Sequence, residues 1–179
     1  HIDRSNTHSL KWDLYKDRDV IPMWVADMDF ASPPEVLQAL RERVDHGVLG
    51  YTLTPQTLNQ AVVERCQTLY SWAIKPEWIV WLPGLVVGLN LVCRSLGRED
   101  DEVVTFTPIY PPFLSAPKLS QRSLLRVPLI KDGTRYAFDV DRLQASVTDR
   151  TKILLLCSPY NPVGRAFTAE ELRQVAEIC

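Results

Sequence analysis

The sequence predicts an α/β protein with a three-layer α/β/α arrangement around a mainly parallel sheet. From Trp78 onward, segments typical of strands and helices alternate, and this order requires crossover connections between parallel strands. Residues 152–157 form an apolar run of the kind found in a buried parallel strand. Thr168 and Glu171 then stand at the spacing of a capping box, which predicts that a helix begins there.

Two helices are predicted in the first seventy residues, behind an irregular arm. Ser32 and Glu35 have capping-box spacing, so the first helix is expected to begin there and to reach about Val44. The second helix is expected to begin at Thr54-Pro55, with proline at its first position, and to end near Tyr70.

The remaining elements follow from apolar runs and turn residues. Strands are expected over residues 78–82, 102–106, 122–128 and 153–157. Helices are expected over residues 85–96, where Gly97 ends the helix, from Asp139 to about Val147, and over residues 168–178.

The composition is that of an ordinary globular protein. The chain has 179 residues, of which 46% are apolar and 23% charged, and its net charge is −2. Nothing in it indicates a nucleic-acid partner or a membrane partner, because no basic patch, long apolar run or secretory leader is present. We therefore expect a cytoplasmic protein. The four cysteines lack metal-ligand or redox spacing, so no metal site is expected, and Cys66, Cys93 and Cys157 are interpreted as small buried residues.

Asn161 is the polar residue most clearly placed for binding. It lies between Pro159 and Pro162, just after the strand predicted over residues 153–157. Open α/β sheets bind ligands at the carboxyl ends of their strands, and the two prolines restrict the backbone on both sides. The amide of Asn161 could donate a hydrogen bond to a phenolate-type oxygen. The alternative is an Asn-Pro turn formed for its shape alone.

Two further positions lie at strand ends. The backbone amides of Gly84, Leu85 and Val86, at the start of a predicted helix, could bind a phosphate, although any turn of this kind can contain a glycine. Tyr110, in a proline-rich loop, could stack on a planar ligand, or it could simply pack against its own loop.

Residues 24–30 place two carboxylates among large apolar side chains. The backbone near Ala26 and Asp27 could face a substrate. The favoured interpretation of the carboxylates is an anchored arm in which Asp27 or Asp29 accepts backbone N–H groups. Farther along, the hydroxyl of Tyr51 could reach an anion, while an exposed tyrosine without a role is the alternative.

In this order, these motifs resemble the fold-type I pyridoxal-phosphate enzymes of the class I/II aminotransferase superfamily. The resemblance is closer to the cystathionine β-lyase (C–S lyase) branch that includes MalY and PatB. It rests on residues 24–30 and 158–165, with shorter matches at residues 11–13, 46–51, 83–86 and 107–113.

The resemblance implies pyridoxal 5'-phosphate as the cofactor and a role for each matching residue. Gly84, Leu85 and Val86 would bind the phosphate, Tyr110 would stack on the pyridine ring, and Asn161 would bind the phenolic oxygen. Tyr51 would reach the phosphate of a neighbouring subunit, which implies a homodimer with shared sites. Ala26 and Asp27 would lie near the substrate carboxylate.

The resemblance also implies a domain assignment. Residues 1–46 would form the N-terminal arm and a segment of the small domain, and residues 47–179 the first, incomplete part of the cofactor-binding large domain. The Schiff-base lysine of the family would lie in a serine-rich loop beyond Cys179. No catalytic residue is therefore assigned, and the chain alone is expected to be inactive.

The implied reaction of the full-length protein is β-elimination from cystathionine or another cysteine S-conjugate, which gives a thiol, pyruvate and ammonia. An aminotransferase of the same superfamily is the first alternative, and the Asp27-Met28-Asp29-Phe30 element favours the lyase. The second alternative is a non-catalytic ligand-binding or regulatory module.

Overall fold

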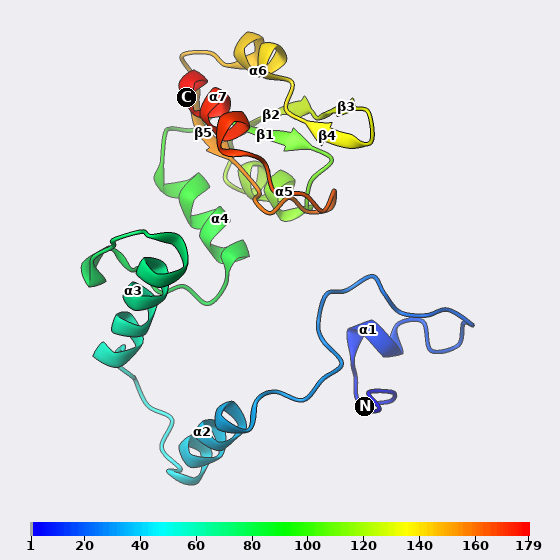
Figure 1. Cartoon of the computed structure of the whole chain (residues 1–179), viewed down its shortest axis with the longest axis vertical. Helices are drawn as coiled ribbons and strands as arrows, with labels where there is room; N and C mark the ends of the chain where they lie inside the picture. Colours follow the sequence, from blue (N-terminus) through cyan, green and yellow to red (C-terminus); the bar gives the residue numbers. More distant parts are fainter. Residues whose placement is uncertain (1) are drawn as a thin grey trace. The chain divides into compact units, whose positions relative to one another are not determined.

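The computed structural model describes residues 2–179, and the chain divides into two compact units, His1–Ala73 and Ile74–Cys179 (Figure 1). Residues 2–73 of the first unit contain three helices, and the second unit contains the parallel sheet. Among residues 2–179, no helix is both long and apolar enough to cross a bilayer.

The helices of the first unit are α1 (Leu10–Asp13), α2 (Pro34–Asp45) and α3 (Gln56–Tyr70). The predicted cap at Ser32 is wrong, because Pro33 occupies the N-cap position of α2 and no side chain caps it. Pro34 lies in the first turn, where its fixed φ suits a helix and its missing N–H costs no hydrogen bond. The end of α3 at Tyr70 is confirmed, and Ser71 follows in the left-handed conformation with a φ of 52°.

A three-stranded parallel sheet organises the second unit. Its strands are β1 (Glu102–Thr107), β2 (Ser123–Pro128) and β5 (Thr151–Leu155), in the order β2-β1-β5. Between β2 and β5 the chain also forms an antiparallel hairpin of β3 (Ile130–Asp132) and β4 (Arg135–Ala137). The parallel sheet confirms the predicted fold class.

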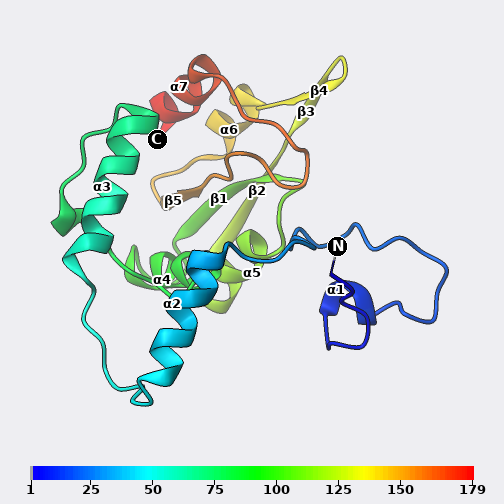
Figure 2. The ribbon, with the colours of Figure 1, turned by 60° about the horizontal axis from the view of Figure 1, so that its bottom comes forward.

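Helices cover both faces of this sheet, as Figure 2 shows. One face is covered by α4 (Leu85–Ser95) and α5 (Pro112–Leu119), and the other by α6 (Val140–Ser146) and α7 (Ala169–Ile178). The predicted caps of α6 and α7 are confirmed, since Asp139 accepts from the N–H of Arg142 and Thr168 forms a capping box with Glu171.

The side chains of β1 alternate between two apolar cores, as the period of a strand requires. Val104 and Phe106 pack with Leu143 of α6 and Val175 of α7. On the opposite face, one cluster of buried residues contains Val103, Cys93, Ala116, Ile153 and Leu155. Cys93 is thus buried as predicted, whereas Cys66 and Cys157 are only half-buried.

The strand predicted over residues 78–82 is wrong. A short 3₁₀ helix, η1 (Pro76–Trp78), occupies its beginning, and residues 79–82 belong to neither sheet in the described part of the chain. Val80 is 78% exposed, so this apolar run is not buried within its own unit. An apolar run becomes a strand only where a neighbouring strand satisfies its backbone hydrogen bonds.

Glu102 is a buried carboxylate at the amino end of β1. It accepts hydrogen bonds from the hydroxyls of Thr148 (2.6 Å) and Thr151 (2.8 Å), and from Arg150 Nη2 (2.7 Å). These bonds, led by the one from Thr148, lower the pKa of the Glu102 carboxyl. They tie the start of β1 to the turn that precedes β5.

We expect Glu102→Gln to destabilise the chain more at pH 7 than at pH 3. The pKa of Glu102 is lower in the folded chain than the unfolded value of about 4.3, so its stabilisation is complete above that value and is lost as the pH falls through the folded pKa. Urea unfolding of both proteins across this range measures the difference. Glu170→Gln, which alters an exposed ion pair, is the control. A difference between Glu102→Gln and wild type that does not change with pH would contradict the assignment.

Candidate functional site

The carboxyl ends of β1 and β5 lie side by side, and each leads into a proline-containing loop. The two strands are parallel, with Thr105 paired to Leu155, and the buried hydroxyl of Thr105 donates to the carbonyl of Leu155 at 2.8 Å. The backbone N–H of Tyr110 donates to the carbonyl of Asn161 at 3.1 Å. Two predicted site residues that are far apart in the sequence are therefore joined directly.

Both backbone groups of Asn161 are bound by neighbours. Its carbonyl accepts from Tyr110, and its N–H donates to the Sγ of Cys157 at 3.4 Å. The thiol of Cys157 in turn donates to the carbonyl of Pro159 at 3.5 Å. The main chain of Asn161 is thus held on both sides, whereas its amide side chain is exposed.

Arg165 anchors the same loop to the rest of the unit. Tyr160 N–H donates to the carbonyl of Arg165 at 2.7 Å, which closes the turn that contains Asn161. The guanidinium of Arg165 donates to the carbonyl of Tyr136 and, at 2.7 Å, to Glu171. It also lies 4.4 Å from the ring centre of Phe167. The loop is thereby fixed to both β4 and α7.

Glu171 remains ionised in this arrangement. Burial alone raises the pKa of its carboxyl, but hydrogen bonds from Thr168 and Arg165 together outweigh the effect of burial, so the pKa lies below its ordinary value. The capping box of α7 and the anchor of the Asn161 loop therefore share one carboxylate.

A cavity of about 560 Å³ opens beside these loops. It contains four predicted site residues, Leu85, Val86, Tyr110 and Asn161. The rest of its lining is mostly apolar and comprises Gly88, Leu89, Val92, Phe113, Leu154, Leu155, Leu156, Cys157, Ser158 and Pro159. Tyr110 is 42% exposed, so its ring is not buried against its own loop.

The amino end of α4 lies at this cavity, which Leu85 and Val86 help to line. The N–H groups of a first helical turn have no partner within the helix and carry a partial positive charge. In α4 the first intrahelical bond runs from Gly88 N–H to the carbonyl of Gly84, at 3.1 Å, so the amides of Leu85 and Val86 are not used by it.

Gly84 itself is the N-cap residue of α4 and has an extended backbone. A Cβ atom at this position would meet no other atom within 4 Å, so packing does not require a glycine there.

The other predicted site residues lie in the first unit. Tyr51 is fully exposed there. Asp27 and Asp29 are anchored, but the prediction of backbone N–H donors is wrong, because the donors are the side chains of Arg4, Lys11 and Trp12. Those partners are 17 to 25 residues away in the sequence, and no local motif indicates them.

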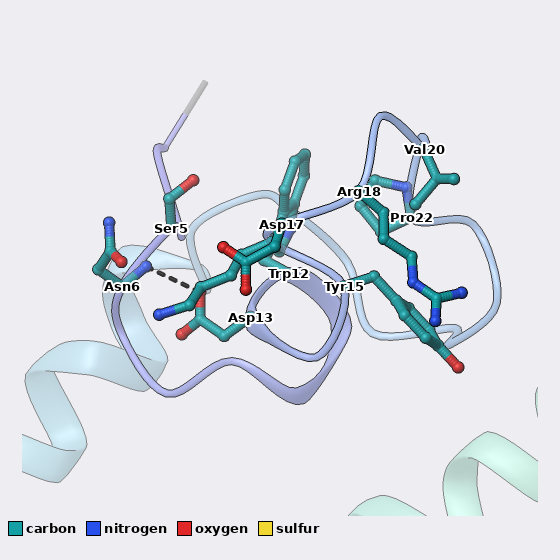
Figure 3. Close-up of a pocket in the computed structure, with 10 residues that line it drawn as sticks. Ser5, Asn6, Trp12, Asp13, Tyr15, Asp17, Arg18, Val20 and Pro22 are labelled. Carbon is teal, nitrogen blue, oxygen red and sulfur yellow. Dashed lines mark hydrogen bonds between the residues drawn. The ribbon is translucent and has the colours of Figure 1, made fainter.

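A second cavity, of about 460 Å³, lies in the arm of the first unit. Figure 3 shows its mixed lining, with Asn6 N–H bound to the carboxylate of Asp13 at 2.8 Å and with Arg18 near Tyr15. The Arg18 guanidinium lies 5.4 Å from the centre of the Tyr15 ring. None of the predicted site residues lines this cavity.

Residues 18–179 match the family described as aminotransferase class I and II. The chain belongs to this family. It is 37% identical to cystathionine β-lyase PatB of Bacillus subtilis and 33% identical to protein MalY of Escherichia coli. Each match covers 99% of the chain and 47% of the relative, so the chain spans about half the length of these curated relatives.

The solved structures agree with these relatives. The chain matches cystalysin from Treponema denticola, which contains a pyridoxal 5'-phosphate cofactor, with a TM-score of 0.90 and 34% identity over 99% of the chain and 47% of cystalysin.

A probable N-succinyldiaminopimelate aminotransferase, DapC of Mycobacterium tuberculosis, is 30% identical over 84% of the chain and 38% of its own length. The resemblance stated from the sequence is confirmed.

We expect Tyr160→Phe to raise the free energy of unfolding by about 1 kcal/mol, since an unpaired buried hydroxyl costs roughly that much or more. Tyr160 is 1% exposed, and its hydroxyl has no hydrogen-bond partner among the described residues. Urea denaturation measures the change, with the exposed Tyr70→Phe as the control. A loss of stability in Tyr160→Phe would show that the hydroxyl does have a partner.

We expect Arg165→Met to loosen the Asn161 loop. Loss of hydrogen bonds from a charged group should speed amide hydrogen exchange at residues 160–164 by about tenfold. Mass-spectrometric hydrogen exchange measures this effect. Arg173→Met, which removes an exposed ion pair of α7, is the matched control and should leave the loop unchanged. Equal exchange rates in the two variants would mean that Arg165 does not hold the loop.

Proposed function

We propose that this chain is part of a pyridoxal-phosphate-dependent C–S β-lyase. The full-length enzyme would cleave cystathionine or another cysteine S-conjugate to a thiol, pyruvate and ammonia. The observation that carries the proposal is the cavity in which the amino end of α4, Tyr110 and Asn161 meet. The family assignment supports the same conclusion.

The residues of this cavity suit the chemical groups of pyridoxal 5'-phosphate. The free amides at the start of α4, with Gly84 beside them, would bind the phosphate. The ring of Tyr110 would stack on the flat pyridine, and the amide of Asn161 would donate to the phenolic oxygen. When bound, the cofactor supplies an electron sink for negative charge at the substrate Cα.

The similarity to named relatives favours elimination over amino transfer. The relatives named PatB and MalY match 99% of the chain, whereas the aminotransferase DapC matches 84% of it. The Asp27-Met28-Asp29-Phe30 element supports the same choice. A non-catalytic ligand-binding or regulatory module could have the same cavity, and the similarity to relatives named as cystathionine β-lyases disfavours it.

We also propose roles for residues of the first unit and a division of the chain into domains. Ala26 and Asp27 would lie near the substrate carboxylate. Tyr51 would bind the cofactor phosphate of a neighbouring subunit in a cytoplasmic homodimer, and its full exposure supports that role. Residues 1–46 would belong to the arm and small domain, and residues 47–179 to the large domain.

We further propose that the chain lacks the lysine that the reaction needs. The lysine that holds the cofactor would lie in the part of the relatives that the chain does not span, so the chain alone would release no pyruvate. Sustained pyruvate release from cystathionine by residues 1–179 with added cofactor would contradict this.

We expect the full-length protein, with pyridoxal 5'-phosphate, to release pyruvate from L-cystathionine. Asn161→Ala should weaken cofactor binding about ten- to hundredfold, because a hydrogen bond to a charged group is lost. Absorbance titration with the cofactor measures the affinity, and Gln144→Ala, an exposed change on α6, is the control. Amino transfer to a keto acid without pyruvate release would favour the aminotransferase, and absence of cofactor binding would favour the non-catalytic module.

A further inference from the structure

Five side chains of the first unit form a cluster that we call the arm clasp: Arg4, Lys11, Trp12, Asp27 and Asp29. The carboxylate of Asp29 accepts from Arg4 Nη1 (2.9 Å), Lys11 Nζ (2.8 Å) and Trp12 Nε1 (2.7 Å). Arg4 also forms an ion pair with Asp27. Three donors from the beginning of the chain thus converge on the segment that contains Ala26 and Asp27.

Lys11 has the central position in the arm clasp. Its side chain is only 10% exposed, and its ammonium donates both to the Asp29 carboxylate and, at 2.9 Å, to the backbone carbonyl of Asp27. A buried ammonium needs such partners because it has lost its water. One charged group therefore fixes a main-chain oxygen and a carboxylate two residues apart, and with them the path of the backbone between them.

The hydrogen bond from Lys11 to the carbonyl of Asp27 sets the direction of the Met28 N–H group. In a trans peptide the N–H and C=O groups point to opposite sides. Since the carbonyl of Asp27 points to Lys11, the N–H of Met28 points away from it. Arg4 Nη1 similarly binds the carbonyl of Met28 at 3.2 Å, which turns the N–H of Asp29 away from Arg4.

Asp29 is the carboxylate that the arm clasp stabilises most clearly. Hydrogen bonds, led by those from Lys11 and then Trp12, lower the pKa of Asp29 to about 2. Asp29 therefore carries its negative charge at neutral pH.

We propose that Lys11 is a positioning residue for substrate binding: it holds the backbone of residues 26–28 so that its outward-facing amides can bind the carboxylate of an amino-acid substrate. This inference rests on the proposed function, in which Ala26 and Asp27 lie near that carboxylate. Lys11 acts through the backbone and does not itself touch the substrate.

The test uses the full-length protein with bound pyridoxal 5'-phosphate and L-cystathionine as substrate. Lys11→Met should raise KM about tenfold, the effect of losing one substrate hydrogen bond, while kcat and cofactor affinity change less than about twofold. Lys16→Met, an exposed lysine of the same arm, is the matched control and should leave KM unchanged. Asp29→Asn, which keeps a hydrogen-bond acceptor for Trp12, should raise KM as well and serves if Lys11→Met does not fold.

Amide hydrogen exchange tests the arm clasp independently of the reaction. With glycine bound in place of cystathionine, the amides of Met28 and Asp29 should be less protected from exchange in Lys11→Met than in Lys16→Met, because they no longer face the ligand carboxylate. An unchanged KM, or a fall in kcat or cofactor affinity equal to the rise in KM, would overturn the positioning role. A wild-type protein that turns over no cystathionine would refute the proposed function and the substrate role together, whereas unchanged exchange in Lys11→Met in an active enzyme would refute the clasp alone.

Discussion

The parallel pairing of β1 with β5 is the constraint on which the candidate site depends. Backbone hydrogen bonds align the two strands, and the buried hydroxyl of Thr105 adds a bond to the carbonyl of Leu155. The pairing brings the ends of both strands to one edge, where Tyr110 binds Asn161. Without this register, the two loops would share no cavity.

The second requirement is that the Asn161 loop keeps its shape away from the sheet. Three different groups fix it: the thiol of Cys157, the backbone of Tyr110 and the guanidinium of Arg165. Arg165 depends in turn on Glu171, which also caps α7. The stability of a surface helix and the geometry of the ligand loop are therefore coupled through one ion pair.

Local signals predicted much of this arrangement from the sequence. The caps at Asp139 and Thr168 are formed by side chains three residues or fewer from their partners, so their spacing identifies them. The Asn161 loop was also predictable, because two prolines follow a buried strand. Leu85, Val86, Tyr110 and Asn161 line one cavity, and their binding of the cofactor stays a prediction.

What could not be predicted depends on partners far away in the sequence. Residues 78–82 have the composition of a strand but belong to neither sheet of the described chain. The helix α5 was missed because it contains Pro112 and Pro117, which normally indicate a break, yet Pro112 lies in its first turn. The arm clasp joins residues at least sixteen positions apart, and its members carry no local spacing signal.

Both backbone groups of Asn161 are hydrogen-bonded within the folded chain, and this lowers the entropic cost of binding a ligand. A flexible loop must give up conformational entropy when it closes on a ligand, at a cost of roughly 1–2 kcal/mol for each residue that becomes ordered. In this chain that entropy is already lost on folding, through the bonds to Cys157 and Tyr110. A ligand that meets Asn161 therefore finds a backbone that is already ordered, and little of its binding energy is consumed in ordering the loop.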